Sequence, residues 1–370
     1  MLTNVSRRPV AKLSGRSLIT WRVIQILTWL IGFSIFICLI FFPAVGLLIF
    51  WNILIPIAPA LLVVAGGVWR NICPLATTNL LARHFNLSKR KIMPATLQAR
   101  LQLVAIVSLF IIVPLRHPVF NTNGMATAIL LCSSVVAGLS MGFVYDWKSG
   151  WCNSLCPIHP VEKLYGSNTL FSIPNAHCDK CVNCSVPCPD STPNIHPASS
   201  KKTVNNKLSG LLTIGGLPGF IFGWFQVPDY KDGINFHRLF EAYEMPALGL
   251  CTSLAIYICL KWLLKKKNER LLIGCFAAAS VSCYYWFRIP ALLGFGKFAS
   301  DGVLIDLKNT LPEWSMLIAV TFTTAFFFWW FTLRKLNHKS WVICPEFAAK
   351  IKPVTFKTHS HFINDVKDRL

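Results

Sequence analysis

Apolar stretches of about 20 residues recur along this chain and alternate with short polar segments rich in Lys and Arg, and about 20 apolar residues is the length of helix that crosses the hydrocarbon core of a bilayer. Of the 370 residues, 54% are hydrophobic and 14% are charged, whereas roughly 25% of residues are charged in a typical soluble domain. The sequence therefore predicts an all-α polytopic membrane protein.

Eight membrane spans are predicted from these stretches. They cover residues 20–42, 46–68, 101–115, 124–145, 209–227, 246–264, 271–287 and 314–333. With the N-terminus inside, only six of the 36 Lys and Arg residues fall outside, namely Arg116, Lys231, Arg238, Arg288, Lys297 and Lys308. Because Lys and Arg accumulate in cytoplasmic loops, we expect cytoplasmic N- and C-termini. The predicted location is the cell inner (cytoplasmic) membrane, which the chain crosses several times.

This topology accounts for the excess of Lys and Arg over Asp and Glu in the chain. The formal net charge is +21, and no nucleic-acid motif accompanies it. Basic residues on the inner face contact anionic lipid headgroups, so membrane lipid is the expected partner and nucleic acid is not. The basic N-terminus precedes a long apolar run without a small-residue cleavage motif, which favours an uncleaved first span over a signal peptide.

One segment carries a metal-binding motif. Residues 177–189 read His-Cys-Asp-Lys-Cys-Val-Asn-Cys-Ser-Val-Pro-Cys-Pro, with Cys178, Cys181, Cys184 and Cys188 in the spacing C-x2-C-x2-C-x3-C-P. This spacing is typical of the bacterial ferredoxins that bind [4Fe–4S] clusters, in which the fourth Cys can ligate a second cluster. A zinc knuckle is the alternative, but zinc sites usually show two separated cysteine pairs. The spacing therefore favours iron of a [4Fe–4S] cluster.

Further cysteines lie at the predicted inner ends of spans, in Cys-Pro dipeptides. They are Cys73-Pro74, Cys152-x3-Cys156-Pro157 and Cys344-Pro345. With the ferredoxin-type motif they bring the inner cysteines to eight, which is the number that two [4Fe–4S] clusters require. In our hypothesis one cluster takes Cys178, Cys181, Cys184 and a remote Cys-Pro thiolate. The other takes Cys188 and three of Cys73, Cys152, Cys156 and Cys344.

Simpler interpretations of these cysteines stay open. Cys152 and Cys156 can be two helix-end thiols, and Cys73 and Cys344 can merely precede a helix-stopping Pro. No cysteine lies in a predicted outer loop, which argues against a disulfide framework. The remaining six are interpreted as small packing residues within spans: Cys38, Cys132, Cys251, Cys259, Cys275 and Cys283.

The predicted topology divides the chain into five regions. They are a basic cytoplasmic N-terminus (1–19), a four-helix membrane region with a Cys-Pro motif (20–145), a cytoplasmic iron–sulfur segment of ferredoxin type (146–208), a second four-helix membrane region (209–333) and a basic cytoplasmic tail with a Cys-Pro motif (334–370). The fold class is thus a helical membrane protein with a small ferredoxin-like loop on its inner face.

Three histidines near the cysteines have two interpretations. His159, His177 and His196 can tune a cluster through hydrogen bonds, but solvent-facing loop histidines are the simpler expectation. The outer segment 228–245 is likewise interpreted as a solvated loop. The run Gly215-Gly216-Leu-Pro-Gly219 predicts close helix packing or a kink in a membrane span.

Several cofactor motifs are missing from the sequence. No predicted span carries the His pair of a membrane haem b, no C-x-x-C-H attaches a haem c, and no G-x-G-x-x-G follows a strand to bind NAD or FAD. Electrons must then be exchanged with a mobile carrier or a partner protein. Quinone is the natural mobile carrier for a protein lodged in the bilayer.

The combination of membrane helices, C-x3-C-P at a helix end and a ferredoxin-type motif resembles the membrane-bound [4Fe–4S] polyferredoxin family of bacterial respiratory chains, of the NapH, NosR and CcoG type. The resemblance covers residues 45–198. It implies a protein that oxidises quinol, relays electrons toward a periplasmic reductase, or assists metalloenzyme maturation. The chain departs from the family pattern in having one full ferredoxin motif instead of two, Trp69 at the leading Cys position of the first C-x3-C-P, and four spans after the cluster segment.

The sequence favours one function and leaves two alternatives open. The favoured function is electron transfer by one or two clusters between a quinone pool or soluble donor and a partner redox enzyme. The first alternative is an assembly or maturation factor that reduces a metal or thiol for another membrane enzyme. The second is a redox-sensing or structural iron–sulfur protein. Whether the chain is itself an enzyme, such as a quinol dehydrogenase, stays open, and no catalytic residue is named.

Overall fold

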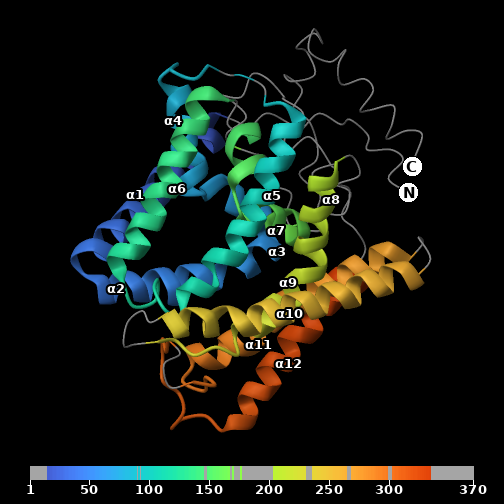
Figure 1. Ribbon diagram of the computed structural model, residues 1–370. Helices are drawn as coiled ribbons and strands as arrows, with labels where there is room; N and C mark the ends of the chain where they lie inside the picture. The colour runs from blue at the N-terminus through green and yellow to red at the C-terminus, as the bar shows by residue number, and fades with distance from the viewer. Residues whose placement is uncertain are drawn as a thin grey trace.

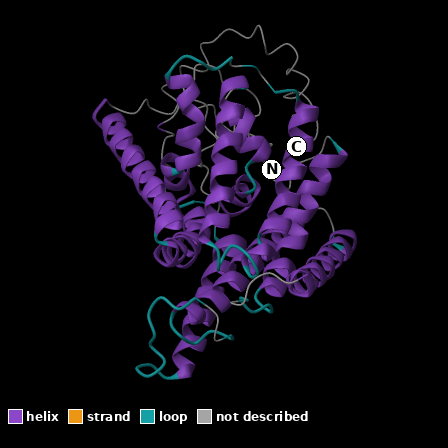
Figure 2. Cartoon of the chain, turned by 60° about the vertical axis from the view of Figure 1, so that its left-hand side comes forward, coloured by secondary structure: helices purple, strands orange, loops and turns teal. Residues whose placement is uncertain are grey.

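The structure is a computed structural model, and it describes residues 15–89, 91, 93–145, 148–166, 169–170, 176, 203–230, 236–264, 268–298 and 302–334. The described residues form helices joined by loops, with one isolated bridge between Lys91 and Tyr145 and no strand in these ranges (Figure 2). The elements are α1 (Gly15–Phe41), α2 (Pro43–Leu47), η1 (Leu48–Leu54), α3 (Ile55–Ile72), α4 (Pro74–His84), α5 (Ala95–Ile112), η2 (Pro114–Arg116), α6 (Gly124–Val144), η3 (Lys148–Leu155), α7 (Ile158–Tyr165), α8 (Val204–Leu211), η8 (Leu212–Gly216), α9 (Leu217–Trp224), α10 (Phe236–Leu263), α11 (Glu269–Leu292), α12 (Glu313–Phe328) and η10 (Trp329–Leu333).

Seven helical segments of the described chain are long and apolar enough to cross a membrane. They are Gly15–Phe41, Pro43–His84, Thr96–Arg116, Gly124–Val144, His237–Leu263, Glu269–Leu292 and Glu313–Leu333. The multi-pass helical class is therefore confirmed, and the described residues contain seven candidate spans against the eight predicted. The predicted span 209–227 is helical through α8, η8 and α9 but is not among the seven. Its Gly, Pro, Ser, Thr and Gln residues dilute the apolar character that a span requires. Both chain termini and the ferredoxin-type motif lie outside the described residues.

Helix α11 is the most buried of the seven candidate spans. Half of its apolar span is buried inside the protein, against 11–22% for the other six spans. Val281 and Tyr285 of α11 pack in one core with Leu62 of α3, Tyr165 of α7 and Phe327 of α12. This core joins α9 to α12 to α3 and α7, helices whose arrangement can be followed in Figure 1. Most of the surface of the other six spans is not covered by protein and is available to lipid.

Glycines permit the closest helix contact of the structure, between α9 and α10. A Cβ on Gly219 would collide with the carbonyl of Gly249, and a Cβ on Gly223 would collide with the carbonyl of Met245. Gly215 likewise packs directly on the ring of Tyr257. Small residues allow membrane helices to approach each other closely. The predicted packing role of this glycine-rich run is confirmed.

We expect Gly219→Ala to destabilise the protein by about 1–3 kcal/mol, because the added methyl group overpacks the contact between α9 and α10. The matched control is Gly138→Ala in α6, where a Cβ would meet only Trp151 at an ordinary distance of 3.7 Å. Thermal unfolding of the purified protein in detergent measures the effect. Equal melting temperatures for the two variants would contradict the described packing.

Candidate metal centre

Cys73 lies in the sharp turn between α3 and α4. Its backbone has φ −58° and ψ 116°, outside the helical region, and Pro74 begins the next helix. A residue that precedes Pro avoids helical geometry because of a clash with the Pro ring, and Pro itself is well accommodated in the first turn of a helix. The Cys-Pro dipeptide therefore makes the chain turn here and places the Cys73 thiol at the end of α3.

The second Cys-Pro segment has a similar local design. Cys152 lies within the π-helix η3, and the amide of Cys156 donates to the carbonyl of Trp151 at 3.1 Å. Pro157 then precedes α7. Short π-helical turns occur frequently at functional sites because they redirect side chains. Both described Cys-Pro dipeptides thus place a thiol at a junction between two helices.

The structure brings these thiols into one neighbourhood. Cys73 and Cys152 pack against one small cluster of α4, formed by Ala76 and Leu80. Burial raises the pKa of the Cys156 thiol to about 12, and the neighbouring Cys73 contributes to this increase. At neutral pH the Cys156 thiol is therefore protonated unless a metal displaces the proton, as metal binding to cysteine does.

A buried ion pair connects the helices that carry the thiols. Arg70 of α3 donates from Nε to Glu162 Oε1 of α7 at 3.0 Å, and His159 Nδ1 lies 3.5 Å from Glu162 Oε2. Burial by itself would raise the pKa of Glu162, but Arg70, His159 and Lys163 together lower it to about 2. Burial lowers the pKa of His159, and Glu162 opposes this effect. Glu162 is thus a carboxylate held between buried positive groups.

His159 corrects one expectation from the sequence. The residue is 2% exposed and lies on α7, so it is not a solvent-facing loop histidine. The cause is that α7 folds back against α3, which places His159 beneath the Cys-Pro turns. His177 and His196 lie outside the described residues.

The chain that leads to the ferredoxin-type motif is held at the same end of α3. The amide of Ala176 donates to Oδ1 of the fully buried Asn71 at 2.9 Å, and Asn71 stands two residues before Cys73. Earlier in this segment, the amide of Leu170 donates at 2.8 Å to the carbonyl of Val64. The backbone of α3 is kinked at Ala65, and a kink of this kind frees helix carbonyls for other donors.

The predicted ligand residues fall into two groups. Cys73, Cys152 and Cys156 are brought together. The predicted ligands Cys178, Cys181, Cys184, Cys188 and Cys344 lie outside the described residues. Within the described ranges, no three His, Cys, Asp or Glu side chains are placed to hold a metal ion. Thiol chemistry and proximity fit an iron–sulfur group, but the described cysteines supply only part of a ligand set.

Three of the span cysteines differ from the packing role expected for them. Cys132, Cys251 and Cys259 are exposed, whereas Cys38, Cys275 and Cys283 are partly buried. The exposed thiols lie on faces of α6 and α10 that meet lipid in a membrane-spanning helix. An apolar lipid face accepts a small apolar thiol as readily as a core does.

Sequence reasoning missed the residues that connect the site, namely Arg70, Asn71 and Glu162. A signal was present in the sequence, because Arg70 and Asn71 immediately precede a Cys-Pro at the end of an apolar run. Ionisable or strongly polar residues in such a position are functional candidates in membrane proteins. Their partners were not visible, because Glu162 is distant from Arg70 along the chain.

Comparison of the chain with protein-family models, with curated proteins and with solved structures found no match.

We expect Glu162→Gln to destabilise the protein by about 3–5 kcal/mol, because it removes the negative charge that pairs with the buried Nε of Arg70. The double variant Arg70→Met, Glu162→Met removes both charges and should recover a large part of the loss. Thermal unfolding in detergent measures both variants. An additive loss in the double variant would show that the two residues do not act as a pair.

We expect Asn71→Ala to free the Ala176 amide, because the substitution removes its buried hydrogen-bond acceptor. An unsatisfied buried N–H costs about 1–3 kcal/mol, so amide hydrogen exchange should accelerate in a peptide that contains residue 176. Peptides from α11 serve as the internal control and should be unchanged. Unaltered exchange at residue 176 would contradict the contact.

Proposed function

We propose that this protein is a membrane electron-transfer protein that carries one or two [4Fe–4S] clusters at the inner ends of its helices. In this proposal it passes electrons between a quinone pool or a soluble donor and a partner redox enzyme. The cysteine spacing of residues 178–188 supports an iron–sulfur group. The described helices support a setting within the membrane.

The observation that carries the proposal is the meeting of two Cys-Pro turns at the place where the motif-bearing segment is held. Cys73 and Cys156 are far apart in the sequence but lie within electrostatic reach of each other. Ala176 is bonded to Asn71, beside Cys73, and precedes Cys178 by two residues. Two residues of extended chain span at most about 7 Å. The motif therefore begins within reach of the membrane-end thiols.

This arrangement supports shared ligation between the membrane helices and the motif. The described thiols are too few for a cubane by themselves, and the four motif cysteines supply the remainder. We assign Cys178, Cys181 and Cys184 to one cluster with one Cys-Pro thiolate. We assign Cys188 to the other with the remaining Cys-Pro thiolates, to which Cys344 belongs by sequence pattern alone.

The chain's own residues have defined tasks in this proposal. The Arg70–Glu162 ion pair fixes the spacing of α3 and α7, which carry or adjoin Cys73 and Cys156. Trp151, which precedes Cys152, is 5% exposed, so the chain around this thiol is largely removed from water. When bound, a [4Fe–4S] cluster supplies one-electron transfer, and its reduction potential depends on solvent exposure and on hydrogen bonds to its sulfurs.

The charge distribution supports a donor or acceptor on the inner side. The segments assigned to that side hold most of the Lys and Arg residues of the chain, and a positive surface steers an acidic redox protein toward it. Quinone, dissolved in the bilayer, reaches the protein from the lipid-facing helices. The carrier that reduces the clusters, either quinone or the soluble redox protein, sets the direction of electron flow.

We expect Cys73→Ala and Cys156→Ala each to lower the iron content of anaerobically purified protein by about four atoms, because each removes a ligand of one [4Fe–4S] cluster. Cys275→Ala in α11 is the matched control, since Cys275 is also partly buried, and it should keep the wild-type iron content. Iron analysis together with EPR after dithionite reduction measures the effect. Full iron content in both test variants would remove Cys73 and Cys156 from the ligand set.

A further inference from the structure

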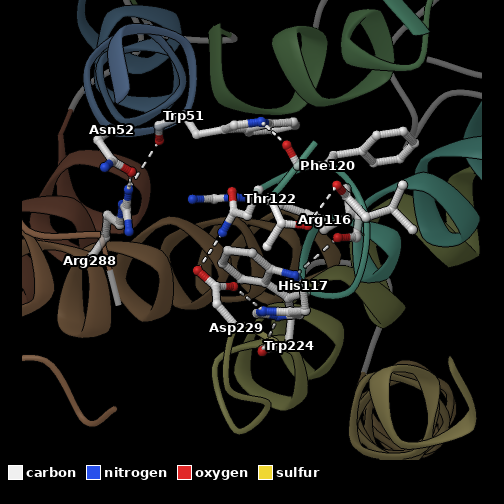
Figure 3. Close-up of polar contacts among 12 residues, drawn as sticks. Trp51, Asn52, Arg116, His117, Phe120, Thr122, Trp224, Asp229 and Arg288 are labelled. Carbon is white, nitrogen blue, oxygen red and sulfur yellow. Dashed lines mark hydrogen bonds and ion pairs between the residues drawn. The ribbon is translucent and has the colours of Figure 1, made fainter. Parts of the chain in front are cut away.

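A second buried polar layer lies at the other end of α3. Asn52 precedes α3 by three residues, whereas Cys73 follows it directly, and an 18-residue helix is about 27 Å long. Figure 3 shows side chains of η1, η2, α9 and α11 converging in this layer. Arg116, His117 and Arg288 are each 3–4% exposed. Positively charged groups are thus buried far from the cysteine site.

The carboxylate of this layer is already engaged. His117 Nδ1 lies 2.6 Å from Asp229 Oδ1, and His117 Nε2 lies 3.1 Å from the carbonyl of Trp224 (Figure 3). Asn121 donates to the other carboxylate oxygen of Asp229. The two ring nitrogens of His117 thus lie against a carboxylate oxygen and a carbonyl oxygen. Asp229 is therefore engaged by His117 and Asn121 and forms no ion pair with Arg288 among the described residues.

Arg288 has only neutral partners. Its Nη2 donates to the carbonyl of Trp51 at 3.0 Å and to Oδ1 of Asn52 at 2.5 Å (Figure 3). Among the described residues it forms no ion pair, and its Nε has no hydrogen-bond acceptor. A buried charge without a counter-charge costs several kcal/mol. The buried charge of Arg288 therefore has no counter-charge among the described residues.

A second unpartnered donor lies beside Arg288. The hydroxyl of Tyr284 is buried and lies close to the Arg288 guanidinium, but its O–H has no hydrogen-bond acceptor within the described chain. Tyr284 precedes Arg288 by four residues on α11, so both side chains lie on the same helix face. The charges of Arg288 and Arg116 both act on the Tyr284 hydroxyl. A guanidinium N–H and a phenol O–H thus lie together with no acceptor of their own.

We propose that Arg288 Nε–H and the Tyr284 hydroxyl bind a small inorganic anion, with chloride as the physiological ligand. An anion supplies both the missing acceptor and the missing negative charge, whereas a neutral carbonyl supplies only the first. Arg288 is 3% exposed, which leaves no open approach for a bulky lipid headgroup. The bound anion would hold the end of α11 against η1.

The test is thermal unfolding of the full chain in detergent, with gluconate replaced by chloride or bromide at constant ionic strength. A ligand that binds only the folded state raises the melting temperature with a saturable dependence on its concentration. We expect this increase in the wild type and its loss in Arg288→Gln and in Tyr284→Phe. The control is Arg238→Gln, an outer Arg that packs on the ring of Tyr230 and should keep the response.

Two outcomes would overturn the proposal. One is an equal melting temperature of the wild type in chloride and gluconate. The other is a full chloride response in Tyr284→Phe, a variant that keeps the packed ring and removes only the hydroxyl. If Arg288→Gln does not fold, the ³⁵Cl NMR signal is measured instead. We then expect wild-type protein to broaden this signal and Tyr284→Phe to lose the broadening.

Discussion

The buried ion pair between Arg70 and Glu162 is the interaction on which the proposed metal centre depends. It joins α3 to α7, and these helices position the thiols of Cys73 and Cys156. Removing either charge would take away a main compensation of the other at a buried position, so the pair favours one arrangement of the two Cys-Pro turns. Asn71 adds the third component, because it holds the segment that leads to the ferredoxin-type motif. A local polar network thus organises a site whose ligands come from three parts of the sequence.

Charged groups are buried at both ends of the membrane region, and they are compensated differently at each end. At the cysteine end, the carboxylate of Glu162 is surrounded by Arg70, His159 and Lys163. At the other end, Asp229 is engaged by His117, and Arg288 is left with neutral acceptors. The central helix α11 contributes to the core and to the second polar layer. In our account, an iron–sulfur group completes one end and a small anion completes the other.

The helical membrane class could be predicted from the sequence, because the length of an apolar stretch is a local property. Cys spacing is local too, so the candidate cluster ligands could be chosen in the same way. It did not predict that Glu162 pairs with Arg70, since that contact arises only when α7 folds back on α3. The same folding buried His159. The segment 209–227 is helical as predicted but is not among the seven apolar spans, because it is rich in the glycines that pack against α10. Lipid-facing and core-facing thiols such as Cys132 and Cys283 were indistinguishable, because a membrane helix is apolar on every side.

The most direct test of the central claim is the content of iron and acid-labile sulfide in wild-type protein purified without oxygen. Our account predicts about eight iron and eight sulfide per chain, because the eight inner cysteines match two [4Fe–4S] clusters. About four of each would confine the site to a single cluster and remove the second from the proposal. Stoichiometric zinc in place of iron would contradict the electron-transfer function.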